Sequence, residues 1–184
     1  AGSTINIYDG ELNGSHVVNG GIMSLAGTTL NLYNGTLNGS VADTRGGAIF
    51  ASAGSVINMY NGTINGGSAE DGGAICMTGS TFTMNGGTVQ NGTASKVGGN
   101  FFLIWDTTYL SSKVILNDGL ITGGTATKSG GNAGGQNGSV YQIHGGKITN
   151  GTINPTSYAG AYSSTSSFTN DLSGVGGNIS LQGN

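Results

Sequence analysis

One motif recurs at a constant interval along the chain, and this period limits the possible folds more than any other feature. Gly21, Gly47, Gly73 and Gly99 each end a Gly-Gly pair, and each lies 26 residues after the previous one. Residues 46–98 contain two consecutive copies that both begin Gly-Gly-Ala-Ile. A constant period of this size is typical of repeat proteins, in which each repeat buries its apolar face against its neighbours.

The composition excludes several other classes of protein. Gly accounts for 38 of the 184 residues and Pro for only 1, without the Gly-X-Y triplets of collagen. Charged residues make up 7%, and Ile, Val and aromatic residues recur, which distinguishes the chain from a disordered tail. With 5 Lys or Arg residues and a net charge of −3, we expect no nucleic-acid partner. The longest apolar run, 101–105, is too short for a transmembrane segment.

Within each repeat, apolar residues alternate with polar ones at a period of two, which predicts β-strands. We predict three short strands per coil: one after the Gly-Gly pair, as in 48–51, one like Ile57-Asn58-Met59, and a third with a single inward residue. The inward residues of the third strand are Leu12, Leu37, Ile64, Val89, Ile121 and Ile148.

Stacking these coils predicts an all-β parallel β-solenoid, or β-helix, because no single coil could bury its aliphatic residues alone. We expect one domain over 1–184, with about six to seven coils of ~26 residues. Two segments depart from the period. These are an aromatic-rich excursion at 103–113 and a loose Ser- and Tyr-rich loop at 155–167.

The repeats resemble those of a known family. The segments 46–49 and 72–75 read Gly-Gly-Ala-Ile, 82–85 reads Phe-Thr-Met-Asn, and 168–171 is a weaker echo of the latter. They resemble the GGAI and F-x-x-N repeats of chlamydial-type polymorphic outer membrane proteins and of other bacterial surface proteins. The resemblance implies a right-handed parallel β-helix with three strands per coil, exported and used in adhesion or as a surface coat.

Opposite charges recur at the repeat spacing. Arg45 precedes Asp71 by 26 residues, and Glu70 precedes Lys96 by 26. These spacings predict structural ion pairs between adjacent coils. The alternative is an acidic catalytic or ion-binding cluster, but carboxylates used in acid–base chemistry should face a cleft and stay unneutralised. We therefore predict no catalytic residue here.

The chain offers no pattern for a metal or cofactor. His16 and His144 are far apart in the repeat register and have no companion ligands, so no metal site is predicted. The Gly-rich segment 131–138 lacks the Lys-Ser/Thr ending of a phosphate-binding loop, so no cofactor is predicted. We expect a protein that is not an enzyme.

Asparagine is abundant in the turns, and many copies begin an Asn-x-Ser/Thr sequon. In a secreted eukaryotic protein these would be acceptors for glycans. The interpretation that we favour is turn chemistry together with asparagine ladders between coils, because Asn-Gly recurs wherever a turn is needed. The sequons begin at Asn13, Asn34, Asn38, Asn61, Asn91, Asn137, Asn150 and Asn178.

Outward Thr and Asn residues form partial arrays on two strand faces. Flat ranks of this kind resemble ice-binding faces, although Lys113 and Ile115 interrupt them and Thr is also a common strand residue. In the second strands the array comprises Thr4, Asn6, Thr29, Asn31, Asn58, Thr81 and Thr83. In the third strands it comprises Thr36, Asn38, Thr63, Asn65 and Thr88.

An apolar column is expected on the outside of the first strands. If Ile49 and its equivalents point inward, then Phe50, Cys76 and Phe102 stack outward, near the excursion that carries Trp105 and Tyr109. An exposed aromatic stripe predicts a face that binds a partner. The alternative is that the excursion at 103–113 folds over it.

These patterns predict a non-enzymatic, extracellular or cell-surface β-helix that serves as a structural or adhesive rod. The strand edges of the end coils predict end-to-end stacking with another copy, and a neighbouring surface protein or glycan is the other expected partner. Two alternatives are an ice-binding protein and a carbohydrate-binding or carbohydrate-active β-helix.

Overall fold

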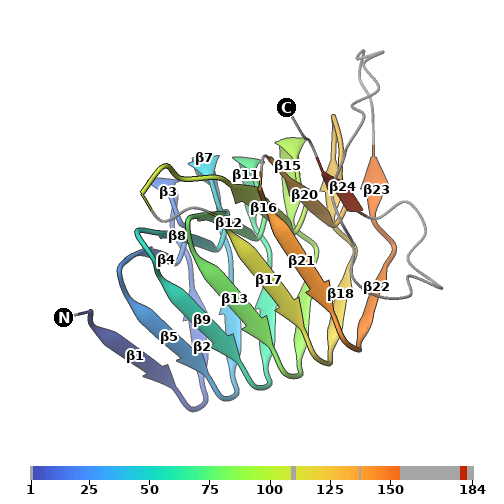
Figure 1. The fold of residues 1–184 in the computed structure, drawn as a ribbon. Coiled ribbons are helices and arrows are strands. Elements are labelled where there is room, and N and C mark those ends of the chain that lie inside the picture. Colours follow the sequence, from blue (N-terminus) through green and yellow to red (C-terminus); the bar gives the residue numbers. More distant parts are fainter. Residues whose placement is uncertain (1, 109–110, 137, 154–178, 182–184) are drawn as a thin grey trace.

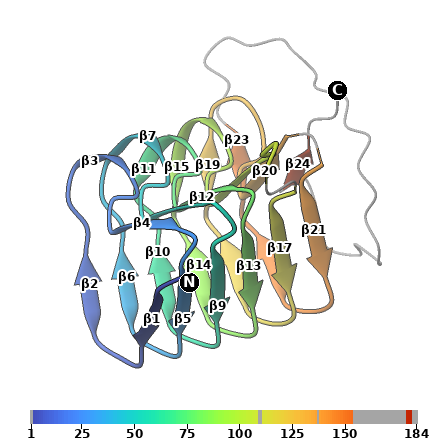
Figure 2. The same ribbon diagram turned by 60° about the vertical axis from the view of Figure 1, so that its left-hand side comes forward.

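The computed structural model describes residues 2–108, 111–136, 138–153 and 179–181, and it shows an all-β parallel solenoid. The chain passes through four strands in each coil and then returns beside the first of them, one coil further along (Figure 1). Like strands therefore stack into four parallel sheets of six strands each, which we call sheets A to D (Figures 1 and 2).

Sheets A and B form two adjoining faces of the stack. Sheet A contains β1 (Thr4–Ile7), β5 (Thr29–Leu32), β9 (Val56–Met59), β13 (Thr81–Met84), β17 (Lys113–Leu116) and β21 (Val140–Ile143). Sheet B contains β2 (Glu11–Asn13), β6 (Thr36–Asn38), β10 (Thr63–Asn65), β14 (Thr88–Gln90), β18 (Leu120–Thr122) and β22 (Lys147–Thr149).

Sheets C and D complete each coil. Sheet C contains β3 (Val17–Asn19), β7 (Ala42–Arg45), β11 (Ser68–Asp71), β15 (Thr93–Val97), β19 (Thr125–Ala126) and β23 (Thr152–Ile153). Sheet D contains β4 (Met23–Ala26), β8 (Ile49–Ser52), β12 (Ile75–Thr78), β16 (Phe101–Ile104), β20 (Ala133–Gly135) and β24 (Ile179–Leu181).

The prediction of three strands per coil is wrong, because sheet C supplies a fourth. Its strands carry one small inward residue, as with Ala42, Ala69 and Ala94, between polar residues. A single Ala gives almost no apolar alternation, so the segment 68–71 was indistinguishable from a polar turn in the sequence. The small side chain is what allows sheet C to lie close to the core.

The predicted register is confirmed where the Gly-Gly motif sets it. Ile75 pairs with Ile49 in sheet D, and Asp71 pairs with Arg45 in sheet C, both at the 26-residue spacing. In sheet A the pairing is offset by one residue in alternate directions, since Thr29 pairs with both Thr4 and Val56. Bulges in sheet C restore the common register in each coil.

The inward side chains form continuous columns. Leu30, Ile57, Phe82 and Val114 stack in sheet A and are fully or almost fully buried. The predicted column of the third strands is confirmed in sheet B, from Leu12 through to Ile148. Parallel stacking thus buries a thin aliphatic core that every coil shares with its neighbours.

The Gly-Gly pairs form the corner between sheets C and D. Gly46 has a φ of 64°, and a Cβ atom there would lie 2.1 Å from the carbonyl oxygen of Ile49. At Gly47 a Cβ would lie 2.2 Å from the carbonyl oxygen of Gly73 in the next coil. The first glycine is therefore required for its conformation and the second for the close approach of coils.

The expected excursion begins later than predicted. β16 continues through Ile104, so the segment that leaves the coil is 105–112, and β17 resumes the stack at Lys113. Thr81 pairs with Lys113 across this insertion, so the longer coil keeps its place in sheet A. The loop expected at 155–167 lies outside the described residues.

The inside–outside assignment predicts unequal costs for truncating two isoleucines. Ile75 is fully buried in β12, whereas Ile115 points outward from β17. We expect Ile75→Ala to lower the free energy of unfolding by about 2–5 kcal/mol, and Ile115→Ala by less than about 1 kcal/mol. Urea denaturation followed by circular dichroism measures both, and equal losses would contradict the assignment.

Candidate functional surfaces

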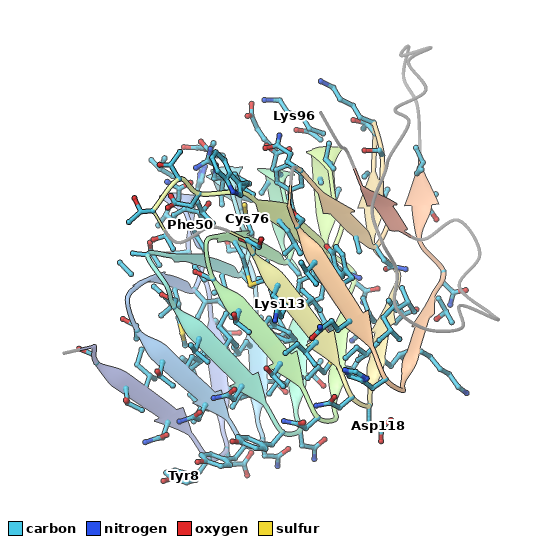
Figure 3. The ribbon with its side chains drawn as sticks, viewed as in Figure 1. Tyr8, Phe50, Cys76, Lys96, Lys113 and Asp118 are labelled. Atoms are coloured by element: carbon cyan, nitrogen blue, oxygen red, sulfur yellow. The ribbon has the colours of Figure 1, made fainter. Side chains whose placement is uncertain are left out.

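The outward face of sheet A carries two ranks of polar side chains along the solenoid axis. Thr4, Thr29, Val56 and Thr81 pair in one rank. In the second rank the amide of Asn31 donates to Asn6 at 2.8 Å, and the amide of Asn58 donates to Asn31 at 2.9 Å. Thr83 continues this rank, and Ile115 then ends its polar character. In Figure 3, Lys113 stands on the same face.

Sheet B carries a longer ladder. The amide of Asn38 donates to Asn13 at 2.9 Å and to Glu11 at 2.6 Å. Asn65 donates to Asn38 at 2.7 Å, and Gln90 donates to Asn65 at 2.7 Å. Each amide thus uses its N–H toward one coil and its oxygen toward the next, which satisfies both groups without water. The rank beside this ladder contains Thr36, Thr63 and Thr88.

The corner between sheets A and B carries an aromatic ladder that the sequence reasoning missed. Tyr8, Tyr33 and Tyr60 stack with centroids 5.0 Å apart and rings inclined by 5°. They are exposed by 69%, 38% and 45%, and Tyr8 lies at the lower corner in Figure 3. The signal was present as Tyr followed by Asp or Asn and Gly at the repeat spacing.

A second missed feature is a buried asparagine pair at the corner between sheets B and C. The amide of Asn100 donates to Asn132 at 2.8 Å and to the carbonyl oxygen of Thr122 at 2.8 Å. The side-chain oxygen of Asn100 accepts the backbone N–H of Gly92 at 2.8 Å. Buried amides are stable only when their groups are paired, so this pair fixes the corner of the longer coils.

The structure contains an ion pair between adjacent coils at Glu70 and Lys96. Lys96 Nζ lies 2.5 Å from Glu70 Oε2, and the hydrogen bond to Glu70 raises the pKa of Lys96. Another pair, which was not predicted, joins His16 Nε2 and Asp43 Oδ1 at 2.7 Å. Both pairs are substantially exposed, so each stabilises the fold only weakly.

Arg45 and Asp71 are neighbours in sheet C but form no ion pair in the described part of the chain. The Arg45 guanidinium lies over the Phe50 ring, with its carbon 5.8 Å from the centroid, and its Nε has no hydrogen-bond partner. Burial raises the pKa of Asp71, while the charges of Lys96 and Arg45 act in the opposite direction. Burial and the aromatic ring thus oppose the expected pairing.

The expected outward apolar column exists, but most of it is covered. Phe50, Cys76 and Phe102 pair across sheet D, yet Cys76 is 0% exposed and Phe102 only 4%. Burial also raises the pKa of the Cys76 thiol. Phe50 and Cys76 lie beside the segment that joins β16 to β17 (Figure 3). The hydroxyl of Ser112 donates to the carbonyl oxygen of Met77, which ties the end of that segment to β12.

The remaining aromatic residues of the predicted face do not extend this column. Trp105 is 43% exposed, and Tyr109 lies outside the described residues. Burial of the column favours the alternative in which the excursion folds over it, because covered side chains cannot present a stripe to a partner.

Other kinds of site were searched for in the same part of the chain. Among residues 2–108, 111–136, 138–153 and 179–181, no three His, Cys, Asp or Glu side chains are grouped to hold a metal ion. The described residues also include no helix with the length and apolarity needed to span a bilayer. The sequons at Asn137 and Asn178 lie outside the described part.

The geometry defines the class of protein as a parallel β-solenoid repeat protein of about six turns. Comparison with models of known families, with curated proteins and with solved structures gives no significant match. The family suggested by the GGAI motif is therefore not identified by these comparisons, and the functional argument rests on the surfaces described above.

The sheet B ladder predicts a position-specific cost for one added carboxylate. Asn38→Asp replaces an N–H donor by an acceptor beside Glu11 and Asn13, so oxygens would face one another. We expect a loss of about 1–3 kcal/mol in the free energy of unfolding. Asn34→Asp at an exposed corner is the matched control and should change stability by less than about 0.5 kcal/mol. Urea denaturation of the two variants compares them directly.

Asp71 predicts a pH-dependent difference in stability. Since its pKa in the fold is raised, its contribution to stability is present below the usual value of 3.8 and is lost as pH rises through the folded value. We expect Asp71→Asn to be more stable than the unmodified chain at neutral pH, with the gap closing as pH falls toward 3.8. Denaturation midpoints across this range test it, and a gap that widens in acid would contradict it.

Proposed function

We propose that this chain is a non-enzymatic structural segment of an extracellular surface protein, in which the solenoid acts as a stiff rod. The observation that carries the proposal is the pair of amide ladders on sheets A and B. They join successive coils through outward side chains, in addition to the backbone pairing of all four sheets. Uncharged hydrogen bonds of this kind are less sensitive to salt than surface ion pairs, which suits an exposed rod.

The finer features of the proposal come from the sequence. The GGAI segments at 46–49 and 72–75 support a right-handed winding and a place among bacterial surface β-helix proteins. A charged fraction of only 7% leaves a surface dominated by Asn, Thr, Ser and Gly, which supports adhesion to a neighbouring surface protein or glycan through hydrogen bonds.

Assembly of the rod is proposed to use the strand edges. In sheet A, β1 has β5 as its single neighbour. Thr29 donates to the carbonyl oxygen of Ser3, and Tyr33 to that of Ile7, so alternate residues of β1 face β5. The backbone groups of Thr4 and Asn6 then point to the open side, where a strand of another copy could pair.

This arrangement gives a specific test of self-assembly. Thr4→Pro removes an N–H on the open side without removing a bond to β5, whereas Thr4→Val keeps the N–H. We expect the unmodified chain and Thr4→Val to form end-to-end fibres with rising concentration, and Thr4→Pro to remain monomeric. Analytical ultracentrifugation and negative-stain microscopy measure this. A monomeric unmodified chain, or fibres of Thr4→Pro, would contradict the proposal.

A second candidate is ice binding, which the two parallel ranks on sheet A favour. Strands in a sheet lie about 4.8 Å apart, and alternate residues in a strand about 6.8 Å apart, so Thr4, Thr29, Asn6 and Asn31 mark a regular flat grid. Lys113 and Ile115 limit the grid to the first four coils. Thermal hysteresis that is abolished by Thr29→Lys would favour this function over the rod, and its absence would reject it.

A further inference from the structure

Asn-Gly dipeptides occur in two environments, although their local sequences are the same. Asn34-Gly35-Thr36 lies at the corner between sheets A and B, and Asn38-Gly39-Ser40 follows within the same coil at the end of β6. Asn61 and Asn65 repeat this arrangement one coil later. Asn-Gly is the dipeptide most prone to cyclisation, because Gly has no Cβ to hinder attack of its backbone nitrogen on the Asn side chain.

At the ladder positions the attacking nitrogen is already engaged. The N–H of Gly39 donates to the carbonyl oxygen of Asn65 at 2.8 Å, and that of Gly66 donates to Gln90 at 2.6 Å. The Asn38 side chain is itself held by the hydrogen bonds of the ladder. Cyclisation there requires bonds on both reacting groups to break first.

At the corner positions both groups are free within the described part of the chain. Asn34 and Asn61 are exposed, and their side chains make no hydrogen bond. The N–H groups of Gly35 and Gly62 likewise donate no hydrogen bond there. Both glycines have positive φ angles, 96° and 89°, which keep the corner available to glycine alone.

Asn91 separates exposure from engagement of the amide. Its side chain is exposed like that of Asn34, but the N–H of Gly92 is buried and donates to Asn100 Oδ1 at 2.8 Å. If exposure of the Asn decided reactivity, Asn91 would behave like Asn34. If the following amide decides it, Asn91 should behave like Asn38.

We propose that Asn34 and Asn61 are sites of spontaneous deamidation, and that the fold protects Asn38, Asn65 and Asn91. The backbone nitrogen of the following Gly loses its proton and bonds to the Asn side-chain carbon, and the C–N bond to the side-chain nitrogen breaks with release of ammonia. Water then adds to the cyclic imide and opens it to aspartate or isoaspartate.

The corner accommodates the aspartate product. Asp9 and Asp118 occupy equivalent corners in other coils, and each accepts the N–H of the following Gly, at 2.8 Å and 2.7 Å. Each conversion at Asn34 or Asn61 would add one negative charge beside the tyrosine ladder. The isoaspartate product also lengthens the main chain at the turn that holds Tyr33 or Tyr60.

The test follows deamidation of the folded chain at mildly alkaline pH by peptide mass mapping, with isoaspartate detected by enzymatic methylation. We expect Asn34 and Asn61 to convert at least about tenfold faster than Asn38, Asn65 and Asn91, the factor for roughly one hydrogen bond that must break first. In urea all five should convert at similar rates, because their intrinsic reactivity is alike.

Three outcomes would overturn the proposal. They are equal rates at Asn34 and Asn38 in the folded chain, rapid conversion of Asn91, or a rate order that persists in urea. Rapid conversion of Asn91 alone would mean that exposure decides reactivity. Asn34→Gln is the matched variant, and it should remove conversion at that corner while leaving the rate at Asn61 unchanged.

Discussion

The backbone hydrogen bond between equivalent residues of successive coils is the interaction on which the whole structure depends. Each strand is only two to five residues long and could not persist alone. In the stack, every interior strand has a neighbour on both sides, so its N–H and C=O groups are paired within the sheet. Because the sheets are parallel, identical positions meet and side chains of one type form columns. The core, the amide ladders and the tyrosine stack are all consequences of this pairing.

The same dependence explains where the chain tolerates change. The segment 105–112 adds residues between sheets D and A, yet Thr81 still pairs with Lys113, because the insertion leaves the coil at a corner and returns to it. The corner between sheets C and D tolerates no side chain at Gly46 or Gly47, since carbonyl oxygens of neighbouring strands lie too close. Length is therefore free at one corner, while residue identity is restricted at another.

Much of this arrangement could be predicted from the sequence. The period, the Ile49–Ile75 register and the columns of sheets A and B follow from apolar alternation, which large buried side chains make visible. Sheet C escaped prediction because its inward Ala69 gives too weak a signal. The Arg45–Asp71 pair failed for another reason. The spacing placed the two backbones together, but neither burial of the carboxyl nor the nearby Phe50 ring can be deduced from spacing.

Asparagine shows most clearly why spacing alone could not define the candidate surfaces. The same residue type forms an outward ladder at Asn38, a buried corner support at Asn100 and an exposed turn at Asn34. The dipeptide around Asn38 is identical to that around Asn34, so the difference arises entirely from which backbone groups the neighbouring coil offers. In a solenoid, the chemistry of a side chain is determined across coils as much as along the chain. A functional argument for such a protein therefore has to begin from the columns.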